Sequence, residues 1–162
     1  MTKMQAPYQL PHNFLAIANP CVSKHVIDFE KVGLPEYEGY YACILDNVFT
    51  AEECAIMIQA VQAQTNGEWQ QATINSGFTG QEVDSETRLC GRIIWDNADL
   101  AAKIWARCQE HVPEIHQVKD APHITGAGLL MKGWRFGLVG LNSSMRFLRY
   151  FDGNYFRRES RS

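Results

Sequence analysis

The chain has 162 residues, of which 46% are hydrophobic, 11% aromatic and 20% charged. This composition is typical of a globular protein with one packed core, and it excludes an intrinsically disordered chain and a collagen-like fibre. The 15 Lys and Arg residues are outnumbered by 18 Asp and Glu residues, which gives a net charge of −3. A nucleic-acid partner is therefore not expected.

The spacing of the cysteines and the length of the apolar stretches indicate the cellular compartment in which the protein is expected. The five cysteines are widely spaced, odd in number and without a CxxC pair, so we expect reduced thiols. The first residues lack the basic and apolar regions of a signal peptide. No stretch approaches the roughly 20 apolar residues that span a bilayer. We therefore expect a cytoplasmic protein without a membrane partner.

The first half of the chain predicts an irregular arm followed by a strand and a helix. Residues 1–35 are punctuated by prolines and predict an N-terminal arm, and residues 36–162 predict the domain proper. The aromatic and branched run 40–45 predicts a strand. Thr50 to Glu53 has the spacing of a capping box, so we expect a helix over 51–65.

The second half predicts strands around a second helix. Residues 69–74 and 88–95 predict strands on either side of a long loop, 75–86. Asn97 predicts the start of a helix that ends at Pro113, because apolar residues recur at four-residue steps between them. The glycine-rich stretch 122–140 predicts no regular element.

The last residues predict a strand, a turn and a second strand. Residues 145–150 predict a strand in which Arg146, Leu148 and Tyr150 share one face. Asp152-Gly153 predicts a tight turn, and a strand that begins at Tyr155 would complete a hairpin. The order of elements predicts an α+β fold. The arginines of this region are interpreted as a solvated tail; they are Arg146, Arg149, Arg157, Arg158 and Arg161.

Two patterns that resemble sites are interpreted as ordinary surface. His111 and His116 are five residues apart with Pro113 between them, whereas two ligands on one helix face need a step of three or four. Gly126-Ala127-Gly128 lacks the third glycine and the following helix of a dinucleotide-binding loop. We therefore predict neither a metal site nor a dinucleotide site from these residues.

The segment GLNSSMRFLRYFDGNYFRR, residues 140–158, resembles the stretch that leads into the iron site of Fe(II)/2-oxoglutarate-dependent dioxygenases of the prolyl 4-hydroxylase-like branch. The upstream segment ILDNVFTAEECAIMI also resembles the N-terminal support region of that family. The resemblance implies N-terminal helices with the first strands of a double-stranded β-helix, a jelly roll whose barrel is incomplete here. It also implies Fe(II) held by two His and one carboxylate, with 2-oxoglutarate and ascorbate as cofactors.

Two residues are carried over from the family pattern. Tyr150 matches the tyrosine nine residues before the first ligand histidine, which implies a hydrogen bond to 2-oxoglutarate. The alternative is a barrel aromatic without ligand contact. Phe156 falls three residues before that histidine, which implies contact with substrate; the alternative is simple core packing.

The iron ligands themselves depart from the family pattern. Glu159 and Arg161 occupy the positions of His-x-Asp, and a cation at the second position would repel a metal ion. The chain stops at Ser162, before the family's distal histidine, and the sharp end of the match suggests a break such as a shifted reading frame. We therefore assign no catalytic residue and no metal ligand, and we expect the chain as written to be inactive and not to hold these cofactors.

The sequence leaves a second interpretation open, in which the chain is a non-catalytic binding or regulatory module derived from the same fold. Its partner would be a protein or a small molecule that the sequence does not identify. A binding module is expected to be stable. A truncated dioxygenase domain would instead leave strands with unpaired edges, so self-association is expected of it.

Overall fold

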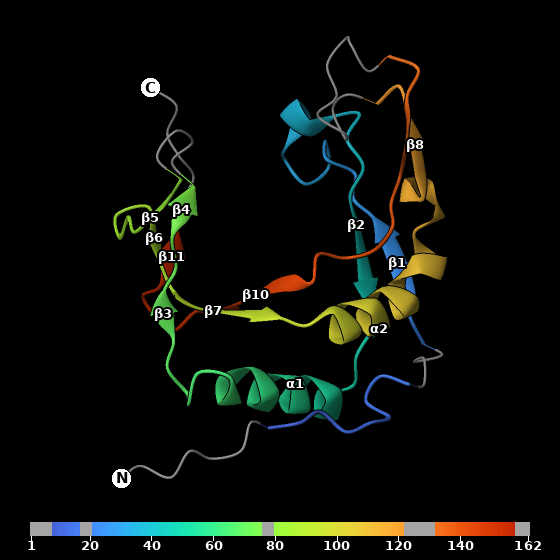
Figure 1. Ribbon diagram of the computed structural model, residues 1–162. Helices are drawn as coiled ribbons and strands as arrows, with labels where there is room; N and C mark the ends of the chain where they lie inside the picture. The colour runs from blue at the N-terminus through green and yellow to red at the C-terminus, as the bar shows by residue number, and fades with distance from the viewer. Residues whose placement is uncertain (1–7, 17–20, 76–79, 122–131, 158–162) are drawn as a thin grey trace, which may run out of the picture. The chain divides into compact units, whose positions relative to one another are not determined.

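The computed structural model describes residues 8–16, 21–75, 80–121 and 132–157. These residues form two α-helices and short antiparallel strands, so the expected combination of helices and strands is confirmed (Figure 1). The helices are α1 (Ala51–Ala63) and α2 (Ala98–Cys108). The strands are β1 (Ser23–Val26), β2 (Cys43–Asp46), β3 (Gln70–Gln71), β4 (Ile74–Asn75), β5 (Gln81–Glu82), β6 (Arg88–Leu89), β7 (Gly91–Asp96), β8 (Gln117–Lys119), β9 (Arg135–Gly137), β10 (Ser144–Arg149) and β11 (Tyr155–Phe156). The strands of the described residues pair in small sheets and do not close a barrel.

The chain divides into two compact units. Unit 1 comprises residues 1–14, 52–98 and 142–162, and unit 2 comprises residues 15–51 and 99–141. Unit 1 therefore holds most of α1 and the sheet β10-β7-β3, whereas unit 2 holds most of α2 and the pairs β1-β2 and β8-β9.

The sheet of unit 1 is built on β7, which pairs with β10 on one side and β3 on the other. Six residues of β10 pair with six of β7, from Ser144 opposite Asp96 to Arg149 opposite Gly91. Side chains alternate between the faces of a strand, and Arg146, Leu148 and Tyr150 are all exposed while the residues between them are partly covered. The predicted strand and the shared face of these three residues are confirmed.

The predicted hairpin at the end of the chain is wrong. A turn does form, since Asn154 N–H donates to Phe151 O at 2.9 Å and Gly153 has φ +82°. However, β11 pairs with β6, with Tyr155 opposite Leu89. Because Arg149 already lies opposite Gly91, residues 151–154 form an excursion within one long antiparallel pairing instead of a hairpin end.

The two strands expected before α2 are each interrupted. The expected strand 69–74 is divided into β3 and β4, and 88–95 is divided into β6 and β7. The loop expected over 75–86 contains β5, which pairs with β4. Asp84 precedes β6 and accepts hydrogen bonds from the amides of Glu86 and Thr87 at 2.9 and 3.2 Å. Asp is favoured in such turns because its side chain mimics a backbone acceptor.

Helix α1 begins and ends where the sequence predicts, within two residues. Asn66 and Gly67 have φ of +52° and +83°, and Gly67 N–H donates to Gln62 O at 2.8 Å. A hydrogen bond of this span beside a left-handed glycine is a common helix end, because glycine adopts positive φ without steric cost. Ala60 and Val61 are buried on the covered side of the helix.

Unit 2 contains pairings that the sequence did not predict. Within residues 1–35, which were expected to be irregular, β1 pairs with β2. Within the glycine-rich stretch, β9 pairs with β8, while residues 122–131 lie outside the described part. Helix α2 ends at Cys108, before the expected Pro113, and a 3-10 turn over Gln109–His111 follows it.

Arg107 anchors α2 within unit 2. Its side chain is buried, and its Nη1 donates to the carbonyl oxygen of Val48 at 2.9 Å, in the connection between β2 and α1. A buried carbonyl without a partner costs about 1–3 kcal/mol, so this bond ties two segments that are distant in sequence.

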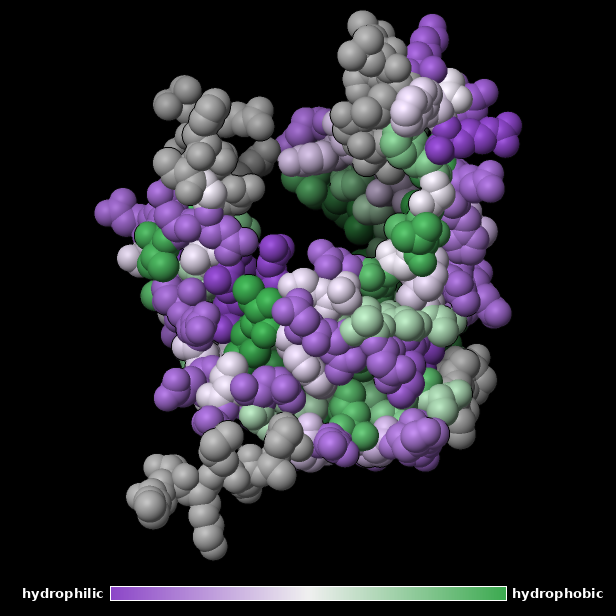
Figure 2. Space-filling model, viewed as in Figure 1, coloured by the Kyte–Doolittle hydropathy of each residue, from purple (hydrophilic) through white to green (hydrophobic). Residues whose placement is uncertain are grey.

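Large hydrophobic side chains also remain open to solvent, and apolar residues are visible among polar ones in Figure 2. In unit 1 the exposed ones include Ile94, Leu148, Tyr150, Phe151 and Phe156. None of the helices in the described ranges has the length and apolar character needed to cross a membrane.

The bond from Arg107 predicts a loss of stability when the guanidinium is removed. Arg107→Met leaves the Val48 carbonyl without its donor, so we expect a loss of about 1–3 kcal/mol in the free energy of unfolding. Urea unfolding followed by circular dichroism measures it. Lys103→Met on the same helix is the matched control, because the Lys103–Asp99 pair lies at the surface and contributes about 0–1 kcal/mol. Equal losses in the two variants would contradict the role of Arg107.

Candidate functional site

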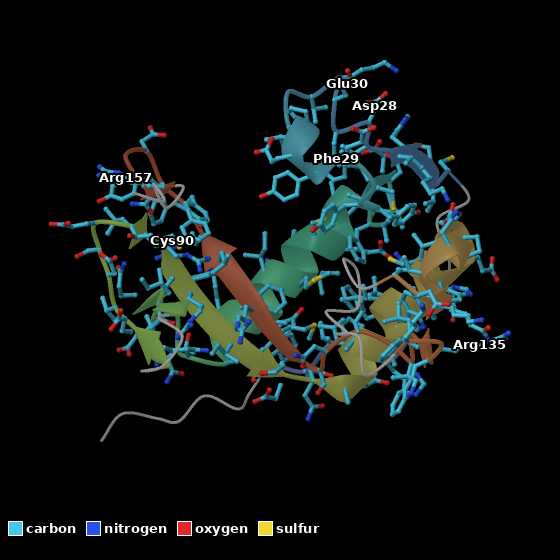
Figure 3. The ribbon with its side chains drawn as sticks, turned by 90° about the horizontal axis from the view of Figure 1, so that it is seen from above. Asp28, Phe29, Glu30, Cys90, Arg135 and Arg157 are labelled. Atoms are coloured by element: carbon cyan, nitrogen blue, oxygen red, sulfur yellow. The ribbon has the colours of Figure 1, made fainter. Side chains whose placement is uncertain are left out.

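Tyr150 directly follows β10 and lies on the exposed face of the unit 1 sheet. Its side chain is 45% exposed. The β10-β7 register continues to bring it opposite Cys90, the buried residue that joins β6 to β7 and is labelled in Figure 3. The Tyr150 hydroxyl interacts with the Cys90 thiol and with the Arg88 guanidinium. The predicted cofactor-binding tyrosine therefore has a cation beside its hydroxyl.

Arg88 contacts both Tyr150 and Phe156, the two site residues predicted from the sequence. Its guanidinium lies 4.6 Å from the centre of the Phe156 ring, and the Phe156 side chain is 61% exposed. Phe156 pairs with Arg88 across β11 and β6, which explains their contact. Simple core packing of Phe156 is thus not what the structure shows. Arg88 has no local sequence signal, because its surroundings depend on pairing with a segment 68 residues later in the chain.

The surroundings of Tyr150 favour its neutral form. Interaction with the Cys90 thiol is the largest cause that raises the pKa of Tyr150 above its ordinary value of 10.0, followed by desolvation. The nearby Arg88 guanidinium acts in the opposite direction because it stabilises a phenolate. The net result keeps the Tyr150 hydroxyl protonated at neutral pH, so it can donate a hydrogen bond.

The other face of the same sheet holds an arginine between two aromatic rings. The Arg149 guanidinium lies 4.5 Å from the ring centres of both Trp69 and Phe151. Trp69 immediately precedes β3, and β7 separates β3 from β10. Gly91 lies opposite Arg149, and a Cβ on Gly91 would meet the Trp69 Cβ at 3.0 Å. The absence of a side chain at Gly91 therefore lets Trp69 reach across β7.

The interpretation of the C-terminal arginines as a solvated tail is wrong, because Arg149 packs against the rings of Trp69 and Phe151. Arg146 and Arg149 belong to β10, and Arg149 is partly buried against two rings. Arg157 follows β11, and its guanidinium lies 4.4 Å from the ring centre of Tyr155. Arg158 and Arg161 lie outside the described residues. At least three of the five arginines thus contact aromatic rings or lie within a strand.

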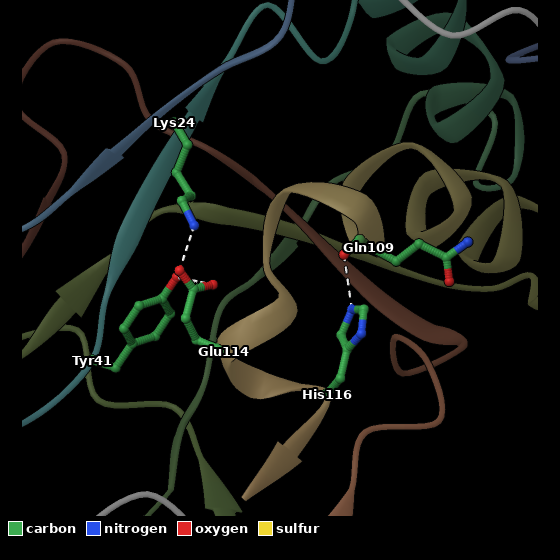
Figure 4. Close-up of polar contacts among 5 residues, drawn as sticks. All are labelled: Lys24, Tyr41, Gln109, Glu114 and His116. Carbon is green, nitrogen blue, oxygen red and sulfur yellow. Dashed lines mark hydrogen bonds and ion pairs between the residues drawn. The ribbon is translucent and has the colours of Figure 1, made fainter.

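Unit 2 has a separate polar cluster around Glu114 (Figure 4). Lys24 Nζ lies 2.6 Å from Glu114 Oε1, and Tyr41 donates to Glu114 Oε2 at 3.1 Å. The Lys24 ammonium is the main cause that holds the pKa of Glu114 below its usual value. Lys24 lies in β1, Tyr41 precedes β2, and Glu114 lies in the 3-10 turn Pro113–Ile115, so these contacts join three segments of unit 2.

The described residues do not provide a metal site. No three His, Cys, Asp or Glu side chains among them are grouped so that they could hold a metal ion. His25 lies 3.2 Å from Asp46, and His116 Nε2 lies 2.8 Å from Gln109 O (Figure 4). Glu159 and Arg161, at the family's ligand positions, lie outside the described residues. The donor set present therefore does not fit the iron that the resemblance implies.

The role of Gly91 can be tested by adding a single methyl group. In Gly91→Ala the new Cβ crowds the Trp69 Cβ, so we expect a loss of about 1–3 kcal/mol in the free energy of unfolding and displacement of Trp69 from Arg149. Chemical denaturation and the shift of the Trp69 indole N–H signal by NMR measure these changes. Gly137→Ala is the control, because Gly137 also lies in a strand and its Cβ would meet only the His116 carbonyl at 3.9 Å. An unchanged indole signal in Gly91→Ala would contradict the role of Gly91 in letting Trp69 reach Arg149.

The pKa of Tyr150 should depend on Cys90. Cys90→Ala removes the largest cause of the rise, so we expect the pKa of Tyr150 to fall toward 10.0, measured as phenolate absorbance against a Tyr150→Phe background. The raised pKa means that the folded chain holds this proton more tightly, so the stabilising effect is present below about pH 10 and is lost as the pH rises above it. Cys54→Ala, an exposed cysteine of α1, should leave the titration unchanged. Equal effects of the two cysteine variants would exclude the proposed cause.

Comparison of the chain with protein-family models, with curated proteins and with solved structures gives no match. The site is therefore defined by its own geometry. A hydroxyl and a guanidinium, from Tyr150 and Arg88, lie together on an open sheet face beside the exposed ring of Phe156.

Proposed function

We propose that this chain is the N-terminal support region and first barrel strands of an Fe(II)/2-oxoglutarate-dependent dioxygenase of the prolyl 4-hydroxylase-like type, in a form that does not itself hold iron. The observation that carries the proposal is the position of Tyr150. It follows β10 in the segment that resembles the family, and its protonated hydroxyl lies beside Arg88. A hydroxyl and a guanidinium side by side are suited to a carboxylate, the group that 2-oxoglutarate presents.

The finer fold, a double-stranded β-helix, belongs to the same proposal. Antiparallel pairing of β10 with β7 and of β11 with β6 supports it, because jelly rolls are built from antiparallel strands. The exposed apolar side chains of this face also support it, since the inner face of a barrel strand is apolar and needs further strands to cover it.

Iron would supply the oxidative chemistry of an intact relative, in which 2-oxoglutarate is decarboxylated to succinate while a C–H bond of the substrate is hydroxylated. The residues of this chain do not fit that ion: Glu159 and Arg161 replace His-x-Asp, and no donor group of the described residues substitutes for them. The role left to this chain's own residues is to bind a carboxylate through Tyr150 and Arg88.

A non-catalytic binding module is the second candidate function. It is favoured by the exposed apolar row of the unit 1 sheet, where Ile94, Leu148 and Phe156 are open to solvent. Under this alternative the same face would contact a protein or small-molecule partner, or a second copy of the chain through strand edges.

The dioxygenase proposal predicts that iron binding can be rebuilt at the family positions. Under anaerobic conditions with Fe(II) and 2-oxoglutarate, we expect no visible charge-transfer band from the native chain. The double variant Glu159→His, Arg161→Asp supplies an imidazole and a carboxylate in the family spacing, so a weak band should appear. Absorption spectroscopy measures it, with circular dichroism to confirm that each variant is folded.

The matched control places the same two ligands one residue earlier, in Arg158→His, Ser160→Asp. This variant has the same spacing, but it puts the two ligands at positions that the family motif does not use. Equal bands in the two double variants, or no band in either, would contradict the proposal and favour the binding module.

A further inference from the structure

Two arginines of the unit 1 sheet converge on one threonine. Arg88, Cys90 and Arg92 alternate along β6 and β7, so their side chains share one face. Arg92 Nη1 donates to Thr73 Oγ1 at 2.7 Å, and Arg88 Nη1 lies 3.4 Å from Thr73 O. Arg92 Nη1 also donates to Gln81 Oε1 at 3.2 Å. We call Arg88, Arg92, Thr73 and Gln81 the arginine cluster.

All acceptors in the arginine cluster are neutral. Within the described residues of unit 1, neither Arg88 nor Arg92 forms an ion pair with Asp or Glu. The ion pairs of Asp28, Asp46, Asp99, Glu114 and Asp120 lie in unit 2 and do not involve these arginines. The guanidinium groups of Arg88 and Arg92 thus lie near one another, and no Asp or Glu of the described residues forms an ion pair with either of them.

Burial makes this arrangement costly. Arg92 is only 9% exposed, and the Nε atoms of Arg88 and Arg92 are both buried without a hydrogen-bond partner. A buried cation is expensive unless an anion accompanies it, and two cations that share a neighbour also repel each other. The guanidinium is suited to planar, two-point contact with a carboxylate or phosphate, and each Nε–H here is an unused donor.

We propose that the arginine cluster is a binding site for an oxyanion, a phosphate or carboxylate group, held between Arg88 and Arg92. Arg88 is partly exposed and lies beside the open side chains of Tyr150 and Phe156, so an anion reaches the cluster from the Arg88 end. Arg92, fixed by Thr73 and Gln81, provides the buried end of the site. This site shares Arg88 with the carboxylate-binding role proposed above and extends that role to Arg92. It does not require iron or residues 158–162, so a failure of the iron test and a failure of this site are distinguishable.

Thermal unfolding at constant ionic strength tests the site. A ligand that binds only the folded chain raises the melting temperature in a saturable manner, so chloride is exchanged stepwise for inorganic phosphate in one series and for acetate in another. We expect a saturable rise with at least one of these anions, and the anion that gives it identifies the group. In Arg92→Met the apparent affinity should fall by about tenfold or more.

Arg146→Met is the matched control, because Arg146 lies on β10 on the same face but is exposed and outside the cluster. It should retain the full saturable rise. An equal response of the native chain and Arg92→Met would overturn the proposal, since general salt effects act on every variant alike. Absence of any saturable rise in the native chain would overturn it as well.

A second measurement does not depend on the folding of a variant. In the native chain, phosphate or acetate titration should shift the Nε–H NMR signals of Arg88 and Arg92 to a plateau, while the Arg146 signal stays in place. Signals of Arg88 and Arg92 that do not move would exclude the site.

Discussion

The pairing of β10 and β11 with β7 and β6 is the constraint on which unit 1 depends. One register runs from Ser144 opposite Asp96 to Arg149 opposite Gly91, and it resumes with Tyr155 opposite Leu89. Residues 151–154 leave the pairing between these two stretches. Asn154 stabilises this excursion twice, because its N–H donates to Phe151 O and its side chain accepts from Phe151 N–H at 3.0 Å. Both faces of the sheet receive their functional side chains from this register.

The same register explains two arrangements with different chemistry. On one face it brings Tyr150 beside Cys90 and Arg88, in the row that continues to Arg92. On the other face it sets Arg149 opposite Gly91, where the missing side chain lets Trp69 cover the guanidinium. A shift by one residue would exchange these faces, since side chains alternate along a strand. Carboxylate binding through Tyr150 and the arginine cluster both require the register as it stands.

Local patterns predicted the local features of this chain. Helix α1 begins where its sequence pattern predicts, and it ends at Asn66-Gly67, where both residues have positive φ. The shared face of Arg146, Leu148 and Tyr150 follows from the alternation of side chains along a strand. Tyr150 was predicted as a site residue from the resemblance to a family motif, and its hydroxyl lies beside the Arg88 guanidinium. Arg88, Arg92 and Gly91 could not be found in this way, because their surroundings depend on strands that are distant in sequence. For the same reason the Asp152-Gly153 turn suggested a hairpin, although β11 pairs with β6.

The register is tested most directly by cross-strand nuclear Overhauser effects in the isotope-labelled chain. We expect backbone contacts between Arg149 and Gly91 and, in the same spectrum, between Tyr155 and Leu89. A simple hairpin closed at Asp152-Gly153 would instead give contacts between Phe156 and Arg149. Observation of those hairpin contacts, without contacts between Tyr155 and Leu89, would contradict the continuous pairing and with it the shared face of Tyr150 and the arginine cluster.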